Sequence, residues 1–319
     1  MIAEIICVGT ELLLGETINT NAAFISGKLA EIGIDCYYQS TVGDNPTRIK
    51  SVFDTALKRA DIIIFTGGLG ATDDDITVQS IAEHLNEELV LDENSLNRIK
   101  DFFDKIQTPF TECNKKQALR PKRAVHINNP VGTAPGIIWE IPWYERKKVI
   151  LAFPGVPDEL HLMWEESAKK YLSQFSHSVL VTRYLKFIGI SEVNLGNKVK
   201  DLMTRQNPTV APLVNRWEPT IRIAAKSSKV EDANVLVDAV EKEIMIRVGE
   251  YFYGYGDETL EYIVGKLLID RGLTVSLAES CTGGLISSRL TDISGSSNYI
   301  KLNFVTYSNE SKIKNLGVH

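Results

Sequence analysis

The sequence has few of the residues that build metal clusters and disulfide frameworks. Its 319 residues include only 5 histidines and 4 cysteines, and no two cysteines stand at CxxC spacing. That spacing is typical of zinc ribbons and redox dithiols, so the sequence argues against both classes. No uninterrupted apolar run reaches the roughly 18 residues that a membrane-spanning helix needs. We therefore expect no membrane association and a cytoplasmic location.

An excess of basic charge is also missing. The chain has a net charge of −6 at neutral pH, and residues 1–170 hold 25 acidic but only 18 basic side chains. Residues 171–257 and 258–319 are both close to neutral. Binding to a nucleic-acid backbone needs a basic surface, so direct contact with DNA or RNA is not expected. An acidic domain that binds a phosphate ligand needs backbone amides or a divalent cation to offset its charge.

What is present is a long alternation of strand and helix patterns over residues 1–173. The apolar runs that predict strands lie at 2–8, 34–42, 61–66, 136–141 and 148–153. The amphipathic stretches that predict helices lie at 19–32, 46–59, 75–86, 93–107, 111–119 and 157–173. Near-continuous apolar strands between amphipathic helices are typical of a parallel sheet covered on both faces. We predict an α/β domain with three layers and a mostly parallel sheet.

Two smaller segments follow this domain. Residues 174–254 have the order strand, helix, two strands, helix and short strand, which predicts a small α+β module. The most linker-like sequence of the chain is Gly254-Tyr255-Gly256-Asp257. Residues 258–319 return to strand–helix alternation, but they are too few to close a three-layer domain. We expect them to form a partial α/β domain.

The first candidate site is a glycine-rich loop after the predicted strand at 61–66. Gly67, Gly68 and Gly70 let a ligand approach the backbone closely, and their amides can bind phosphate oxygens. Asp73–Asp75 follow, and we expect them to begin the next helix. A single aspartate there would be read as a helix cap. Three beside a glycine turn favour a magnesium ion that bridges a bound diphosphate.

Other polar loops stand at the ends of predicted strands and at the starts of predicted helices. Each loop alone is a turn as often as a site, but the ligand crevices of open α/β sheets form from such loops. Together with the glycine loop they predict one pocket. The candidate residues in these loops are Gly9, Thr10, Glu11, Asn19, Asn21, Asp44, Thr77, Gly132, Thr133, Pro154 and Gly155.

A second candidate site lies near the C-terminal end of the sequence. A predicted strand runs into Ser280-Cys281-Thr282-Gly283-Gly284 at the start of a helix. Hydroxyls and amides at such a turn can hold an oxyanion or a phosphate. A serine or threonine cap with two glycines for close packing explains the same string equally well. Tyr307 and Lys312 lie downstream, and a lone lysine is a solvated charge in most proteins.

These motifs, in this order, closely resemble the CinA (competence/damage-inducible) family. The resemblance implies a molybdopterin-binding-like fold for residues 1–173. It also implies hydrolysis of ADP-ribose to AMP and ribose 5-phosphate, with a divalent metal such as Mg²⁺ or with K⁺. The segments that carry the resemblance are 9–15, 19–21, 42–45, 67–77, 129–136 and 154–157.

The resemblance also implies roles for individual residues of the first domain. Asp74 and Asp75 would hold the metal, Asp75 would be catalytic, and the other loop residues named above would bind substrate. The family has prolines where this chain has Ala71 and Asp73. We expect these substitutions to loosen the loop and to add a negative charge to it.

For residues 174–254 and 258–319 the resemblance implies a KH-like module and a nicotinamide mononucleotide deamidase domain. The module contains no GxxG loop, so we expect a spacer or oligomerisation role and no RNA binding. In the deamidase domain, Ser280 would be the nucleophile, Lys312 its base and Tyr307 an assisting residue. Residues 282–284, namely Thr282, Gly283 and Gly284, would bind substrate.

Two points bear on this second activity. Cys281 competes with Ser280 as the nucleophile, because a thiol ionises more readily than a hydroxyl. Family members also continue well beyond the position of His319. We therefore expect weak or absent deamidase activity from this chain.

Three functions follow from the sequence. The leading one is a pyridine-nucleotide recycling hydrolase that takes ADP-ribose and nicotinamide mononucleotide as substrates. The second is a module that binds a molybdopterin or a nucleotide without cleaving it. The third is an adaptor in competence or DNA recombination that works through protein contacts. The resemblance implies a homodimer in each case.

Overall fold

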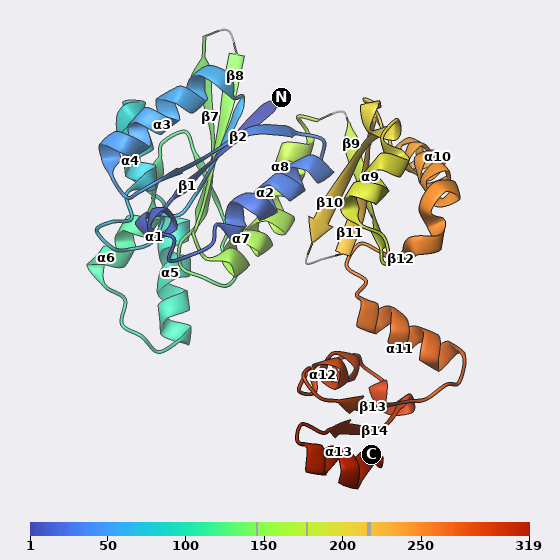
Figure 1. Ribbon diagram of the computed structural model, residues 1–319. Coiled ribbons are helices and arrows are strands. Elements are labelled where there is room, and N and C mark those ends of the chain that lie inside the picture. Colours follow the sequence, from blue (N-terminus) through green and yellow to red (C-terminus); the bar gives the residue numbers. More distant parts are fainter. Residues whose placement is uncertain (145, 177, 216–217) are drawn as a thin grey trace. The chain divides into compact units, whose positions relative to one another are not determined.

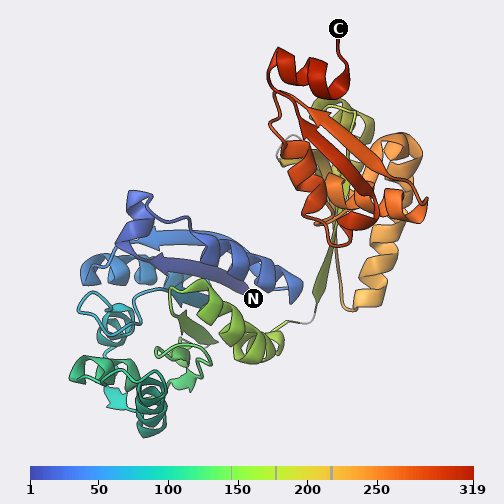
Figure 2. The same cartoon turned by 90° about the horizontal axis from the view of Figure 1, so that it is seen from below.

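The computed structural model describes residues 1–144, 146–176, 178–215 and 218–319 (Figures 1 and 2). They form two compact units. One contains Met1–Leu180 and Lys226–Ala233, and the other contains Val181–Ala225 and Asn234–His319. The division into domains at 1–173, 174–254 and 258–319 stays a prediction.

A mixed sheet forms the centre of the first unit. Among the described residues its strand order is β2-β1-β3-β8-β7-β6. The strands β2, β1, β3 and β8 run parallel, whereas β7 pairs antiparallel with both of its neighbours. The mostly parallel sheet is therefore confirmed. The bounds are β1 (Ile2–Val8), β2 (Asp35–Val42), β3 (Ile62–Thr66), β6 (Val125–Ile127), β7 (Gly136–Trp143) and β8 (Arg146–Phe153).

Both faces of this sheet are apolar, because the central strands are buried on both sides. Ile5 and Ile64 pack with α2 and α7 on one face, and Ile6 and Ile63 pack with α3 and α4 on the other. Burial of each side chain of this size contributes about 1.5–3 kcal/mol to the stability of the folded unit. The result is the predicted three-layer α/β fold (Figure 1). The helices are α1 (Thr10–Leu14), α2 (Thr20–Glu31), α3 (Pro46–Arg59), α4 (Thr77–His84), α5 (Glu93–Lys105), α6 (Glu112–Lys115), α7 (Pro157–Met163) and α8 (Lys169–Ser173).

The structure differs from the sequence prediction at the start of α4. Asp73–Asp75 lie in the turn before the helix, and the helix begins at Thr77. The Asp75 carboxylate accepts hydrogen bonds from the amide and the hydroxyl of Thr72, which closes this turn. The amide of Thr77 donates to the carbonyl of Gly68. The expectation that the aspartates begin the helix was therefore wrong.

A four-stranded sheet with the order β10-β11-β9-β12 lies mostly in the second unit, whereas the start of β9, the end of β11 and the start of α10 belong to the first. This order of strands and helices is the predicted α+β, KH-like arrangement. Its elements are β9 (Val179–Phe187), α9 (Glu192–Val199), β10 (Thr209–Asn215), β11 (Glu218–Ser227), α10 (Val230–Val248) and β12 (Phe252–Tyr255).

The C-terminal segment adds two parallel strands, β13 and β14, with helices before, between and after them. The strand–helix alternation predicted there is confirmed. In the part of the chain that the structure describes, no helix is long and apolar enough to cross a membrane. The bounds are α11 (Leu260–Asp270), β13 (Val275–Glu279), α12 (Leu285–Thr291), β14 (Ile300–Val305) and α13 (Asn309–Leu316).

Candidate active site

A cavity of about 420 Å³ lies at the carboxyl ends of β1, β3 and β8. Loops from distant parts of the first unit form its wall, as expected for an open α/β sheet. The roles of the lining residues stay predictions. Of the predicted site residues, the wall includes Gly9, Glu11, Asn19, Asn21, Asp44, Gly67, Gly68, Gly70, Asp74, Asp75, Thr133, Pro154 and Gly155.

The other three predicted residues of this domain do not line the cavity, but each contacts a residue that does. The Thr10 hydroxyl donates to an Asp44 carboxylate oxygen at 2.8 Å. The buried Thr77 hydroxyl donates to the Gly67 carbonyl at 2.9 Å. The backbone of Gly132 lies against the carboxyl of Glu159. The three residues therefore help to hold the residues of the cavity wall in position.

Glycine is required at two positions of the glycine loop. Gly67 has φ +99° and Gly68 has φ +67°, values that other residues rarely adopt. A Cβ on Gly67 would overlap the carbonyl oxygen of Val8, and a Cβ on Gly68 would overlap the Thr77 hydroxyl. The loop backbone therefore lies directly against the end of β1.

Three other glycines leave room for carboxyl groups of the cavity. At each of them a Cβ would overlap a carboxylate oxygen, so any larger residue must displace an acidic side chain. None of the three has a φ in the left-handed region, so only space is at issue. The pairs are Gly9 with Glu11, Gly70 with Asp75, and Gly132 with Glu159.

Acidic side chains dominate the charge of the cavity. Among the described residues that line it there is no lysine, arginine or histidine. A diphosphate in such a cavity needs cations to offset the repulsion between like charges. The carboxylates that line the cavity are Glu11, Asp44, Asp74, Asp75 and Glu159.

The donor set fits a magnesium ion that arrives with a phosphate ligand. The described residues contain no group of three or more His, Cys, Asp or Glu side chains placed to hold a metal by themselves. Mg²⁺ is commonly bound by one or two carboxylates together with substrate phosphates and water. Asp74 and Asp75 can supply those two carboxylates, and a hydrogen bond from Thr72 lowers the pKa of Asp74.

Sequence reasoning missed several residues that line the cavity, among them Gln117 and Glu159. Glu159 follows the Pro154–Pro157 motif by two positions, so its proximity to that motif was a usable signal. Gln117 stands in a predicted helix with nothing to mark it. Asn21 was predicted, and its amide donates to the Thr66 hydroxyl and the Gly155 carbonyl, which leaves its buried Oδ1 without a partner in the described structure.

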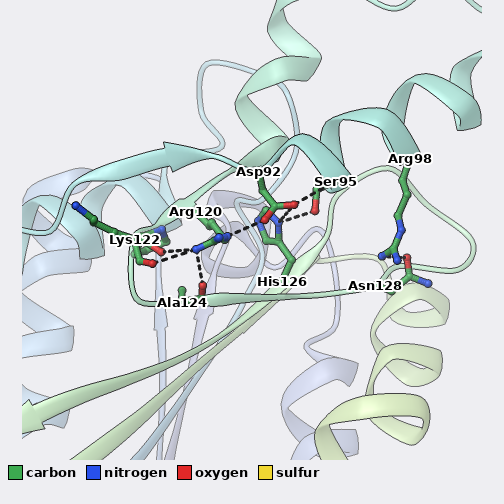
Figure 3. Close-up of polar contacts among 9 residues, drawn as sticks. Asp92, Ser95, Arg98, Arg120, Lys122, Ala124, His126 and Asn128 are labelled. Carbon is green, nitrogen blue, oxygen red and sulfur yellow. Dashed lines mark hydrogen bonds and ion pairs between the residues drawn. The ribbon is translucent and has the colours of Figure 1, made fainter.

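A polar cluster beside the cavity fixes α5 to the strands that precede β7 (Figure 3). Asp92 caps α5 and accepts a hydrogen bond from Arg120 at 2.9 Å. Ser95 Oγ lies 2.6 Å from His126 Nδ1. Burial lowers the pKa of His126 to about 4, against the attraction of Asp92. Burial alone would raise the pKa of Asp92, but hydrogen bonds from Ser95 and Arg120 lower it to about 2.

The second candidate site takes a different form. Ser280 follows β13, and Gly283 and Gly284 adopt φ +61° and +94° in the turn before α12. Tyr307 is 73% exposed. The structure describes Ser280, Tyr307 and Lys312, and it shows no side-chain hydrogen bond among the three. Thr282, Cys281 and the glycines share the turn with Ser280. The amide of Thr306 donates to the Glu279 carbonyl, so the ends of β13 and β14 lie together, but among the described residues no hydrogen bond joins the Lys312 side chain to the turn.

Glu279 organises this turn, and sequence reasoning missed its role. Its buried carboxylate accepts hydrogen bonds from the amides of Ile286 and Ser287 and from the Ser287 hydroxyl. Burial alone would raise the pKa of Glu279, but the hydrogen bonds from Ser287 lower it to about 2. The cap of α12 is therefore supplied by this glutamate rather than by the serine or threonine of the turn.

The chain matches three family models in sequence order. Residues 4–174 match the model described as "Probable molybdopterin binding domain". Residues 182–254 match "Damage-inducible protein CinA KH domain", and residues 257–319 match "CinA C-terminal domain". A competence-damage inducible protein of Clostridium novyi is 47% identical over 319 residues, which is 100% of this chain and 76% of that relative. The chain belongs to the CinA family.

A second relative agrees with this assignment, and one solved structure is similar to part of the chain. A CinA-like protein of Dictyoglomus turgidum is 46% identical over 319 residues, covering 100% of this chain and 77% of that protein. The crystal structure of a CinA protein of unknown function from Thermoplasma acidophilum covers 53% of this chain and 96% of that one, with 36% identity and a TM-score of 0.48. The predicted family and fold class are confirmed.

Proposed function

We propose that this CinA protein is a metal-assisted hydrolase that cleaves the diphosphate of ADP-ribose to AMP and ribose 5-phosphate. One observation carries the proposal. The cavity combines a glycine backbone suited to phosphate oxygens with five carboxylates and no cationic side chain among its described lining residues. A ligand with a diphosphate and a bound cation fits this charge, whereas a free anion does not.

The residues of the glycine loop have two different roles, phosphate binding and cation binding. The backbone of Gly67, Gly68 and Gly70 receives the phosphates, since glycine alone permits so close an approach. Asp74 and Asp75 hold the cation, Mg²⁺ or K⁺, and the hydrogen bonds from Thr72 keep Asp75 in place. A bound divalent cation neutralises phosphate charge and polarises a phosphoryl oxygen.

The test of this activity is the change Asp75→Asn in the full chain. Loss of the negative charge removes one cation ligand while the hydrogen bonds from Thr72 can remain, so AMP production from ADP-ribose is expected to fall at least about 100-fold. The matched control is Asp73→Asn, because Asp73 is exposed and does not line the cavity. Circular dichroism verifies folding. Unchanged AMP production by Asp75→Asn would refute the assignment.

A binding module without hydrolysis is the second candidate, because residues 4–174 match a model described by molybdopterin binding alone. A thermal shift with ADP-ribose, followed by product analysis of the same samples, separates the two. Stabilisation without AMP supports the binding module, and stabilisation with AMP supports the hydrolase.

For residues 258–319 we propose part of a nicotinamide mononucleotide amidohydrolase site, with Ser280 as nucleophile and Lys312 as its base. The support is the match to the CinA C-terminal domain and the turn that presents Ser280. Because Ser280 and Lys312 are not hydrogen-bonded to each other, we expect the chain to release little or no ammonia from nicotinamide mononucleotide. Release of ammonia at a rate abolished by Ser280→Ala would contradict that expectation.

We further propose a homodimer that makes no direct contact with nucleic acid. The acidic balance of residues 1–170 supports the second part of this proposal. Analytical ultracentrifugation tests the first part. Tight, salt-dependent binding of single-stranded DNA would overturn the second.

A further inference from the structure

Glu159 stands apart from the other carboxylates of the cavity. It lies in the first turn of α7 and is half-buried. Asp44 and Asp75 each accept two hydrogen bonds on one oxygen from a single threonine. Thr72 holds Asp75 within its own loop, and Thr10 at the start of α1 holds Asp44. Glu159 instead accepts one hydrogen bond, 2.7 Å long, from the side-chain amide of Asn129. Its other oxygen, Oε1, accepts no hydrogen bond within the described structure.

Asn129 holds a loop over this carboxyl. Its amide nitrogen donates to Glu159 and to the Ala134 carbonyl at 2.9 Å. Its Oδ1 accepts hydrogen bonds from the amides of Val131 and Gly132. Both ends of the side chain are thereby fixed, because the carbonyl and the carboxylate can only accept and the amides can only donate. The backbone of Gly132 lies so close to the Glu159 carboxyl that a Cβ has no room.

We propose that Glu159 is the general base that accepts a proton from the water attacking the diphosphate. This rests on the proposed function. The water oxygen bonds to one phosphorus, and the bond between that phosphorus and the bridging oxygen breaks. The electron pair stays on the bridging oxygen, which leaves with the other phosphate, and the water proton passes to Glu159 Oε1. The products are AMP and ribose 5-phosphate.

The surroundings of Glu159 suit this role. Burial raises its pKa, and the hydrogen bond from Asn129 offsets part of the rise. A base works best when its pKa approaches the working pH, and in the same cavity a hydrogen bond from Thr72 moves the pKa of Asp74 in the opposite direction. The ionisable groups that line the same cavity are Glu11, Asp44, Asp74 and Asp75, and those near Glu159 on its own helix are Asp158 and His161.

The first experiment compares kcat and KM for ADP-ribose in Glu159→Gln and in the wild-type chain. The amide keeps the shape and the contact with Asn129 but cannot take a proton. We expect kcat to fall at least about 100-fold with KM within a few fold. The control is Glu166→Gln, an exposed glutamate near the same helix that does not line the cavity, and wild-type kcat is expected.

The second experiment is the pH profile of kcat. Activity of the wild-type chain should fall at low pH as the base becomes protonated, and Glu159→Gln should lose this acid limb. Asn129→Ala removes the bond that favours the ionised carboxyl, so its acid limb should move to higher pH. Glu159→Asp should keep the limb at a reduced rate.

Failure of this inference is distinct from failure of the proposed function. If the wild-type chain makes AMP while folded Glu159→Gln keeps its kcat and its acid limb, Glu159 is not the base. If Asn129→Ala leaves the limb unmoved, the environment assigned to Glu159 is wrong. If the wild-type chain itself makes no AMP with Mg²⁺, the proposed function fails, and the inference fails with it.

Discussion

The two glycine turns of this protein look alike in sequence and differ in the structure around them. Gly67-Gly68-Leu69-Gly70 follows β3, whose five residues are all buried, and it lies on a cavity reached by loops from distant parts of the chain. Ser280–Gly284 follows β13, of which only Glu279 is buried. In residues 258–319, all described, the buried apolar side chains are Leu290 and Tyr299. Of the two turns, only the first lies on a cavity that a packed core surrounds with other loops in the described structure.

The largest difference between the regions should be in core packing. Ile64→Ala removes a fully buried side chain and should lower the free energy of unfolding of the first unit by about 2–5 kcal/mol. Leu302→Ala, at a side chain that is 53% exposed, should cost less than about 1 kcal/mol. Calorimetry of the full chain measures both changes. Equal losses of unfolding free energy in the two variants would contradict the proposed difference in core packing.

A smaller difference should appear when the same residue type is changed in each turn. Gly67→Ala must adopt φ +99° and push against the Val8 carbonyl, so a loss of about 3 kcal/mol or more is expected. Gly283→Ala adopts φ +61° and meets no atom within 4 Å, so only the left-handed backbone cost of roughly 1–2 kcal/mol remains. If both variants lower the unfolding temperature by the same amount, the backbone of the glycine loop does not lie tightly against the Val8 carbonyl.

A third difference, of about the same size as the second, concerns pH. His126 in the unfolded chain takes up a proton near pH 6.5, whereas the folded chain resists protonation until about pH 4. The first unit should therefore lose about 2 kcal/mol between pH 7 and pH 5. His126→Gln should remove this loss.

The second unit should not share this pH dependence. Because the pKa of Glu279 is lowered, its stabilising effect is lost only as the pH falls from about 4.5 towards 2. A transition of the second unit that moves as much as the first between pH 7 and pH 5 would contradict the comparison.

Long elements could be predicted from the sequence, and short or side-chain-driven ones could not. α3 (Pro46–Arg59) begins at a proline and ends where its apolar spacing ends, so its bounds were predicted as observed. The strands at Leu89–Leu91 and Leu119–Pro121 have three residues each, too few to show a period. The start of α4 depends on how the Asp75 side chain folds back to Thr72, which no spacing reveals.

The same limit applies to the candidate site. Loop glycines and aspartates could be predicted because they stand at strand ends. Glu159 was missed although it follows the Pro154–Pro157 motif, because its environment depends on Asn129, 30 residues earlier in the chain. Contacts between distant loops arise from the tertiary fold and leave no local pattern.

The most direct test of the proposed function is AMP formation from ADP-ribose by the purified full chain in a buffer free of K⁺, with Mg²⁺ and after removal of divalent cations by EDTA. The carboxylate-lined cavity predicts AMP and ribose 5-phosphate in equal amounts with Mg²⁺. After chelation it predicts a rate at least about 100-fold lower. No AMP in the presence of Mg²⁺, or an undiminished rate after chelation, would contradict it.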